Sequence, residues 1–382
     1  MNSLSDTIKY VWRKADLVLL GIIGVTTLYG LVLVATATNY TGEHRDVIVQ
    51  AAAAGLGLVA YFFFSVVDVE HFSEKWKWFL LFNVGFILLL LTPLGVEKYG
   101  NRSWLYASWM PTSIQPAEIV KLTYTVLLAK QVAWFQENRK MRGLDSLFWP
   151  AAHAGFMFVL IVVVSSDAGS ALVYLVIYAG MAFAAGLRWY WFAAGFGTAG
   201  VGITTLVVLD KVPSHMMERF KVLLDHSYDP KGVGWQQTQG LMALGSGGVF
   251  GQGLFNGVQT QSTNPASLPE RQTDFIFCVA GEELGLVGCV AIIILEALII
   301  YRCFRTARMA RSPMESLVCV GFATMLMFQT IENIGMCLFV MPVIGLTLPF
   351  FSSGGSSVLT LYAAMGIVSG IRKRMLPEWL RN

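Results

Sequence analysis

The chain has 382 residues, of which 55% are hydrophobic and only 13% charged, and its mean hydropathy of +0.60 excludes an ordinary soluble globular protein. The formal net charge of +3 does not indicate a nucleic-acid partner and adds little beyond a weak attraction to anionic membrane lipid. The five cysteines have no metal-type spacing and lie in or beside apolar segments, so they predict neither disulfides nor a metal site.

Apolar runs of roughly transmembrane length recur along the chain and predict an all-α integral membrane protein with about ten transmembrane helices. No internal repeat, low-complexity tract or detachable soluble domain is found, so we expect residues 1–382 to form a single polytopic membrane domain. The first run follows a polar leader without a small-residue cleavage site, which favours a retained span over a signal peptide. The predicted spans are Leu17–Thr36, Ile48–Val67, Trp78–Thr92, Ile114–Trp134, Phe148–Val164, Gly169–Gly186, Trp189–Leu209, Phe275–Tyr301, Glu315–Val340 and Ser356–Ile371.

The distribution of Lys and Arg predicts the orientation of these spans. Placing the N-terminus in the cytoplasm puts about 17 cations inside and about 8 outside, most of the latter in one long loop that the positive-inside rule does not govern. Both termini are then cytoplasmic, and residues 210–273 form a long extracytoplasmic loop between the seventh and eighth helices.

Charged residues at the predicted outer face are the first candidates for a site. Arg45 lies in the link before the second span and Arg102 lies beside Trp104 in the loop after the third. Glu118 and Lys121 are stronger candidates because they share one face of a helix whose continuation is membrane-like, where charge is costly. They could form a structural ion pair that fixes helix packing, or a polar site within the bundle.

Further candidates lie around the fifth to eighth spans. Asp167 lies in a very short outer loop, where it could simply cap the sixth span. In the long loop, residues 216–224 have the spacing of an amphipathic helix on the membrane surface, and Arg219 in it could hold an anion or remain a solvated charge. The glycine-rich run 245–253 follows no strand and lacks a P-loop ending, so a flexible loop is favoured over a backbone nest for phosphate.

Asp274 is the strongest candidate. It precedes about 27 mostly apolar residues, so we expect it in the first helical turn at the outer membrane boundary. Thr273 could cap this helix while Asp274 complements the helix dipole, which would need no further function. Asp274, Cys278, Gly281 and Gly285 fall on one small-sided stripe, which could admit another helix or a lipid chain and its head group.

Carboxylates, cations and glycine-rich, helix-starting loops converge on the predicted outer face. One carboxylate can act as general base on a sugar hydroxyl, while cations or a bound divalent ion stabilise a departing pyrophosphate. Spacing and composition alone do not name the substrate. The carboxylates are Asp274, Glu118 and Asp167, and the cations are Arg45, Arg102, Lys121, Arg219 and Arg271.

The stretch from Pro269 to Gly288, PERQTDFIFCVAGEELGLVG, resembles the signature of the SEDS family, the shape, elongation, division and sporulation proteins. The likeness extends over nearly the whole chain. It includes, in the family's order, Arg102–Trp104, Gln115–Lys121, Asp167–Ser170, Glu218–Arg219, Gly245–Gly248, Asn333–Gly335 and Leu348–Ser357.

This resemblance implies a ten-span bundle that acts as a peptidoglycan glycosyltransferase, polymerising lipid II at the outer face of the cytoplasmic membrane. It implies that Asp274 activates the acceptor 4-hydroxyl or helps to hold a divalent cation such as Mg or Mn, with no organic cofactor. Undecaprenyl pyrophosphate would leave, and a class B penicillin-binding protein would cross-link the strands as partner. Polar positions of the family around one central cavity match Glu118, Lys121, Asp167, Arg102, Arg45 and Arg219.

Several positions depart from the family pattern. Gln272 stands where a histidine is frequent, so no acid–base role is expected there, and Ser165 and Ser166 replace Gln-Pro, which weakens the inference for the aspartate that follows. Ala117 replaces a serine and Ser353 a tyrosine. The short N-terminus and the motif spacing favour a role in elongation, with division and sporulation left open.

Two other functions suit a polytopic bundle. A lipid II flippase also needs a polar cavity, but it should show internal pseudo-symmetry, which this sequence lacks. A non-catalytic scaffold of the cell-wall synthesis complex would not need costly charges inside the bundle.

Overall fold

The computed structural model describes residues 15–42, 44–98, 100–110, 112–139, 144–208, 214–225, 232, 234–264 and 266–375. Strands β1 (Gly95–Lys98) and β2 (Asn101–Leu105) form an antiparallel hairpin, and η1 (Asn39–Thr41) and η2 (Leu89–Leu91) are short 3-10 helices. The other elements are α2 (Leu17–Thr38), α3 (Arg45–Val66), α4 (Val69–Ser73), α5 (Trp76–Leu88), α6 (Pro116–Arg139), α7 (Leu144–Ser165), α8 (Ala168–Ala184), α9 (Trp189–Val208), α10 (Ser214–Leu224), α11 (Trp235–Ser246), α12 (Ile276–Met309), α13 (Pro313–Cys337) and α14 (Gly355–Met375).

A helix overlaps every predicted span, which confirms an all-α membrane architecture. Among the described residues, five helices are both long and apolar enough to cross a bilayer: α2 extended by η1, α3, α7, α12 and α13. The apolar segments α5 with η2 and α8 are shorter. The number of crossings and the side on which each loop lies therefore stay predictions.

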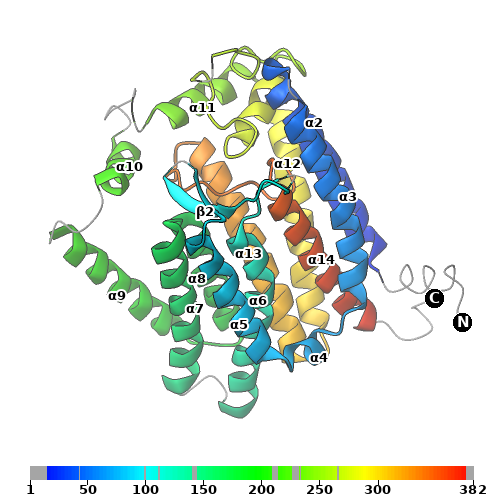
Figure 1. The fold of residues 1–382 in the computed structure, drawn as a ribbon, viewed down its shortest axis with the longest axis vertical. Coiled ribbons are helices and arrows are strands. Elements are labelled where there is room, and N and C mark those ends of the chain that lie inside the picture. The colour runs from blue at the N-terminus through cyan, green and yellow to red at the C-terminus, as the bar shows by residue number, and fades with distance from the viewer. Residues whose placement is uncertain are drawn as a thin grey trace, which may run out of the picture.

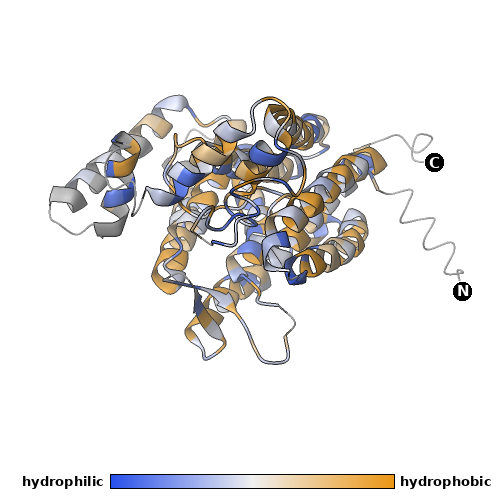
Figure 2. Cartoon of the chain, turned by 90° about the horizontal axis from the view of Figure 1, so that it is seen from above, coloured by the Kyte–Doolittle hydropathy of each residue, from blue (hydrophilic) through white to orange (hydrophobic). Residues whose placement is uncertain are grey.

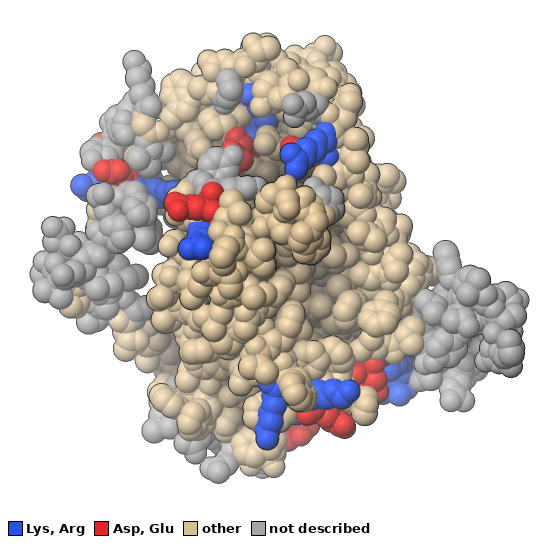
Figure 3. Space-filling view, viewed as in Figure 1, with Lys and Arg blue, Asp and Glu red and all other residues tan. Residues whose placement is uncertain are grey.

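Charged side chains are separated from the middle of the molecule. On the face shown in Figure 3, Lys, Arg, Asp and Glu gather towards the upper and lower ends, with an uncharged band between them. Figure 2 shows apolar residues along the helices around the bundle. This distribution is the one expected of a multi-pass membrane protein.

Glycines bring the central helices into close contact. The middle of α14 is buried, and α14 lies against α3 (Figure 1). A Cβ at Gly366 would lie 2.5 Å from the carbonyl oxygen of Tyr61, and one at Gly370 would lie 2.4 Å from that of Ser65. Small residues that allow such an approach are how helices associate in lipid, where apolar burial supplies little driving force.

The long loop between α9 and α12 contains two helices. The predicted amphipathic helix is confirmed as α10, which follows α9 on the side of the molecule away from α14 (Figure 1). A second helix, α11, was not predicted. It packs beside α12: Gly240 lies against Phe275 and Cys278, and Gly281 lies against Leu244. Another helix therefore occupies the small-sided stripe of α12 at these positions.

The expectation of a flexible glycine-rich loop is wrong, because this run folds against a kink in α12. Gly285 at the kink has φ 68° and ψ −161°, a conformation essentially restricted to glycine. The backbone groups at the kink pair with the run: the amide of Leu286 donates to the carbonyl of Gly248 (3.0 Å), and the amide of Gly253 donates to that of Glu283 (2.9 Å). Glycine is required because a Cβ at Gly251 would lie 2.1 Å from the Glu283 carbonyl oxygen.

Candidate active site

The backbone around Asp274 is fixed by elements that are distant in the sequence. Its carbonyl oxygen accepts a hydrogen bond from Asn333 Nδ2 of α13 (2.8 Å), and the carbonyl of Thr273 accepts one from Ser352 Oγ (2.6 Å), in the segment before α14. The helix that follows begins at Ile276 and has no side-chain cap. The prediction that Thr273 caps this helix is therefore wrong, whereas the favourable interaction of Asp274 with the helix dipole stays a prediction.

The Asp274 carboxylate is half-buried among charged groups. Burial, helped by the carboxylates of Glu270 and Asp167, raises its pKa from 3.8 to about 7, while Arg219 opposes the shift. Gly345, with φ of +74°, lies beside it: a Cβ there would be 3.7 Å from Asp274 Oδ2, an ordinary van der Waals distance. A carboxyl group that titrates near neutral pH suits a general base, since it combines an available ionised form with useful basicity.

Residues 343–345, between α13 and α14, draw two further elements towards this aspartate. Arg219 Nη1 of α10 donates to the carbonyl oxygen of Val343 (2.6 Å). Gly169 in the first turn of α8 lies so near to Ile344 that a Cβ would be 2.3 Å from its carbonyl oxygen. The segment therefore gathers the start of α8 and the cation of α10 at one end of the bundle.

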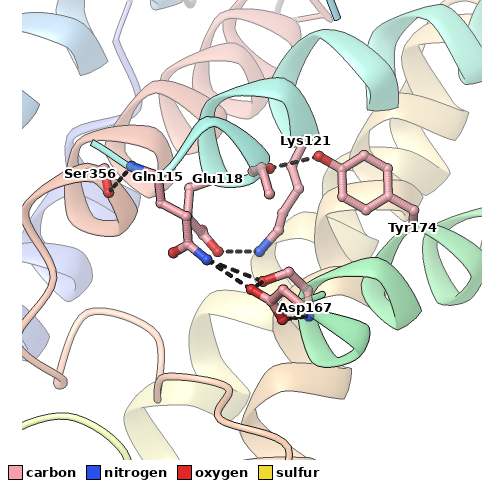
Figure 4. Close-up of polar contacts among 8 residues, drawn as sticks. Gln115, Glu118, Lys121, Asp167, Tyr174 and Ser356 are labelled. Atoms are coloured by element: carbon pink, nitrogen blue, oxygen red, sulfur yellow. Dashed lines mark hydrogen bonds and ion pairs between the residues drawn. The ribbon is translucent and has the colours of Figure 1, made fainter. Parts of the chain in front are cut away.

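Asp167 caps α8, as predicted, and its side chain also contacts Gln115, the residue before α6. Oδ1 accepts from the amide of Ser170 (2.9 Å), whereas Oδ2 accepts from Ser170 Oγ (2.8 Å) and Gln115 Nε2 (3.1 Å). Gln115 immediately precedes α6, and its backbone N–H donates to Ser356 Oγ of α14 (3.4 Å). Figure 4 shows how these contacts bring α6, α8 and α14 together.

Glu118 and Lys121 form the predicted ion pair within α6. Glu118 is 6% exposed and Lys121 only 1%, so both charges are buried. Figure 4 shows the pair on the side of α6 that faces Asp167, while the Tyr174 hydroxyl donates to the carbonyl of Ala117 (2.6 Å) beside them. The pair lies within one helix and near Asp167 (Figure 4), so it supplies buried charge near the site. Its effect on helix packing and its contact with substrate stay predictions.

Two of the predicted arginines lie at the edges of the bundle. Arg102 in β2 donates from Nη2 to the carbonyl oxygen of Thr92 (3.0 Å), which holds the hairpin to the end of η2. Arg45 is the first residue of α3 and is exposed. These placements leave the part that each plays at a substrate cavity as a prediction.

Arg271 was expected among the substrate-binding cations, but its guanidinium is buried in the loop. It is 1% exposed, and it donates to the carbonyl oxygens of Leu268 (3.0 Å), Gln259 (3.2 Å) and Ser262 (3.1 Å). It also lies over the ring of Tyr40, 4.0 Å from the centroid. These contacts give Arg271 a structural role in the loop.

Acidic residues near the site were not singled out from the sequence. Glu332 of α13 is 2% exposed, neither of its carboxylate oxygens has a hydrogen-bond partner among the described residues, and it interacts electrostatically with Asp274. A glutamate inside the predicted span Glu315–Val340 was the available signal. Glu282 and Glu283 of α12 are fully buried and bind the loop.

No cluster of three or more His, Cys, Asp or Glu residues suited to a metal ion occurs in the part of the chain that the structure describes. The divalent cation stays a prediction.

The chain matches known proteins over nearly its whole length. Residues 12–375 match the family described as cell cycle protein, which comprises FtsW, RodA and SpoVE. Stage V sporulation protein E of Bacillus subtilis (strain 168) is 33% identical over 368 residues, covering 94% of this chain and 97% of the relative. The probable peptidoglycan glycosyltransferase FtsW of Tolumonas auensis is 32% identical over 343 residues, covering 89% and 87%.

Solved structures show the same architecture. A chain of a peptidoglycan synthase complex, described as coordinating polymerization and crosslinking, superposes with a TM-score of 0.76 at 28% identity, covering 95% of this chain and 99% of that chain. The rod shape determining protein RodA of Thermus thermophilus superposes with a TM-score of 0.65 at 27% identity, covering 95% and 98%.

Proposed function

This chain belongs to the FtsW, RodA and SpoVE family of cell cycle proteins, and we propose that it is a peptidoglycan glycosyltransferase, the activity by which several relatives are named. Its substrate is lipid II, polymerised for cell elongation or division at the outer face of the cytoplasmic membrane, with both termini in the cytoplasm. The observation that carries this proposal is the half-buried Asp274 carboxylate, held at one end of a multi-pass bundle by backbone contacts to α13 and to the segment before α14.

The reaction joins two sugars through one displacement. The 4-hydroxyl oxygen of the acceptor GlcNAc bonds to the anomeric carbon of the donor MurNAc, while the bond from that carbon to undecaprenyl pyrophosphate breaks and the pyrophosphate leaves with the electron pair. The hydroxyl proton passes to the Asp274 carboxylate, whose pKa of about 7 leaves it substantially ionised at neutral pH.

The leaving group is a dianion or more highly charged, so it needs cations. We assign two cations to it: Arg219, which is exposed on α10 and donates to the carbonyl of Val343, and Lys121, which pairs with Glu118. The protein would supply only part of the ligand set for Mg²⁺ or Mn²⁺, because such ions are commonly bound by one or two carboxylates together with substrate phosphates. In the alternative role of Asp274, its carboxylate would hold the ion and would not act as the base, and the ion would neutralise charge on the pyrophosphate.

A class B penicillin-binding protein is the proposed partner. The support is the fold shared with a chain of a synthase complex that couples polymerization with crosslinking.

Polymerisation of labelled lipid II by the purified protein, with its partner and a divalent cation, tests the proposal. Wild type should make long glycan, and Asp274→Asn, with nearly the same shape but no charge, should make none while remaining folded and partner-bound. Equal glycan from both would overturn the role of Asp274. Absence of polymerisation by wild type, together with lipid II transfer across vesicle membranes, would establish the flippase alternative.

A further inference from the structure

The peptide backbone at Gln259 and Thr260 is gripped from opposite sides by two buried charged residues. Its amides point to Glu282 of α12, and its carbonyls point to Arg271. Glu282 is fully buried and Arg271 is 1% exposed. The arrangement, which we call the loop clamp, consists of Glu282, the backbone of residues 259–260 and Arg271.

The Glu282 side of the clamp uses the whole carboxylate. Oε1 accepts from the amide of Gln259 (2.7 Å), and Oε2 accepts from both the amide (2.8 Å) and the hydroxyl (2.6 Å) of Thr260. Gly257 makes room for this contact, because a Cβ there would lie 2.8 Å from Oε2. Hydrogen bonds to a charged acceptor are about twice as strong as neutral ones, so this grip fixes the loop firmly to α12.

Glu283 and Gln261 extend the attachment to α2. Glu283 accepts from the amide of Phe255 (3.0 Å) and from Gln261 Nε2 (2.8 Å), which also donates to the carbonyl of Thr36 (3.0 Å). The loop is therefore anchored on two helices.

The Arg271 side of the clamp leads directly to the candidate base. Arg271 is three residues before Asp274, and the turn between them is closed by backbone hydrogen bonds from Thr273 (3.2 Å) and Phe275 (3.1 Å) to the carbonyl of Glu270. Glu270 itself has a φ of 49°, unusual for a residue other than glycine. Because these hydrogen bonds fix the turn, we expect a shift of Arg271 to move Asp274 as well.

We propose that Glu282 and Arg271 are positioning residues for Asp274, acting through the loop backbone that they hold between them. The inference rests on the proposed function, because it assigns to the clamp the task of placing the base for glycosyl transfer. Neither residue touches substrate in this mechanism.

The decisive variant is Glu282→Gln, which keeps the side-chain shape. Glutamine keeps only one of the two acceptor oxygens, so the amide group that replaces the other oxygen presents its NH₂ to an N–H donor of residue 259 or 260. The matched control is Glu315→Gln. Glu315, in the first turn of α13, is also a buried carboxylate (5% exposed), but it lies outside the clamp and pairs with Arg374 of α14. Both variants lose a buried carboxylate, and only the first loosens the clamp.

The measurement is backbone amide hydrogen exchange of the peptides that contain residues 271–275, read by mass spectrometry, with lipid II polymerisation measured on the same protein preparations. In Glu282→Gln we expect these amides to exchange about tenfold faster or more, because the turn that carries Asp274 opens more often. We also expect kcat to fall about 100-fold with KM within about twofold, because the base is misplaced while substrate still binds. Glu315→Gln should leave both the exchange and kcat as in wild type.

Hydrogen exchange of residues 271–275 in Glu282→Gln equal to that of wild type would overturn the clamp, whether or not wild type polymerises lipid II. Absence of polymerisation by wild type would instead overturn the proposed function, while the hydrogen exchange still decides the clamp. If Glu282→Gln does not fold, Thr260→Val removes only the 2.6 Å hydroxyl contact. It should accelerate exchange of the same amides by a smaller factor, and unchanged exchange there would reject the proposal.

Discussion

Replacing Asp274 by asparagine should stabilise the protein above neutral pH while abolishing polymerisation. The folded protein holds the Asp274 proton more tightly than the unfolded chain, because burial and nearby carboxylates raise the pKa from 3.8 to about 7. The ionised carboxylate therefore destabilises the fold. The stability contributed by the neutral form is fully present below pH 3.8 and is lost as the pH rises to about 7.

The magnitude follows from that difference in pKa. One pKa unit corresponds to 1.36 kcal/mol, so the rise from 3.8 to about 7 corresponds to about 4 kcal/mol at pH 8. Solvent screening at the exposed edge of the half-buried side chain reduces this to about 1–3 kcal/mol. At pH 5 only the unfolded chain is ionised, and the advantage of asparagine should be less than half as large.

Thermal unfolding of the purified proteins at pH 8 and pH 5 measures the effect. Asp16→Asn is the control with the opposite sign, because Asp16 pairs with Arg302 and Arg372 and the protein should lose stability when its charge is removed. An Asp274→Asn variant that melts below wild type at pH 8, or one that still makes glycan, would contradict the assignment of Asp274 as a strained general base.

Two further predictions concern neighbouring charges. Glu270 raises the pKa of Asp274, so Glu270→Gln should move the acidic limb of the rate–pH profile to lower pH. Arg219 lowers that pKa, so Arg219→Gln should move the limb to higher pH, and each shift should be less than about one unit. Shifts in the same direction would reject this electrostatic explanation. Lys121→Met should cost about 3–5 kcal/mol by leaving the buried Glu118 carboxylate without its partner. The double variant with Glu118→Gln should melt above Lys121→Met, and a lower melting temperature for the double variant would argue against a buried ion pair.

The helices were predictable because their signal is local. Long apolar runs predict spans, and the spacing of apolar residues predicted α10 correctly. α11 was not predicted because WQQTQGLMALGS has a mixed composition, and contacts with Phe275 and Cys278 hold it in place. Those contacts connect residues more than 30 positions apart, so no pattern within α11 reveals them.

The glycine-rich run is a second case in which the local sequence does not predict the structure. Taken alone, residues 245–253 indicate a flexible loop, because glycine accepts many backbone conformations. In the structure the kink at Gly285 provides hydrogen-bond partners, and the absent side chains allow the two backbones to meet. The glycines allow close contact here, and the sequence of the run alone does not distinguish that purpose from flexibility.

The candidate charges were predictable by position, and their roles depend on partners that folding supplies. Arg271 and Asp274 lie three residues apart, yet the first is buried on loop carbonyls while the second remains beside other carboxylates. A charged group whose hydrogen bonds are satisfied stabilises the structure. A carboxylate held near other carboxylates has a raised pKa, which suits it to proton transfer. Glu332, buried without a hydrogen-bond partner among the described residues, belongs with Asp274 by this criterion. We therefore expect buried charges with satisfied hydrogen bonds to build the site, and Asp274 and Glu332 to be the groups available for chemistry.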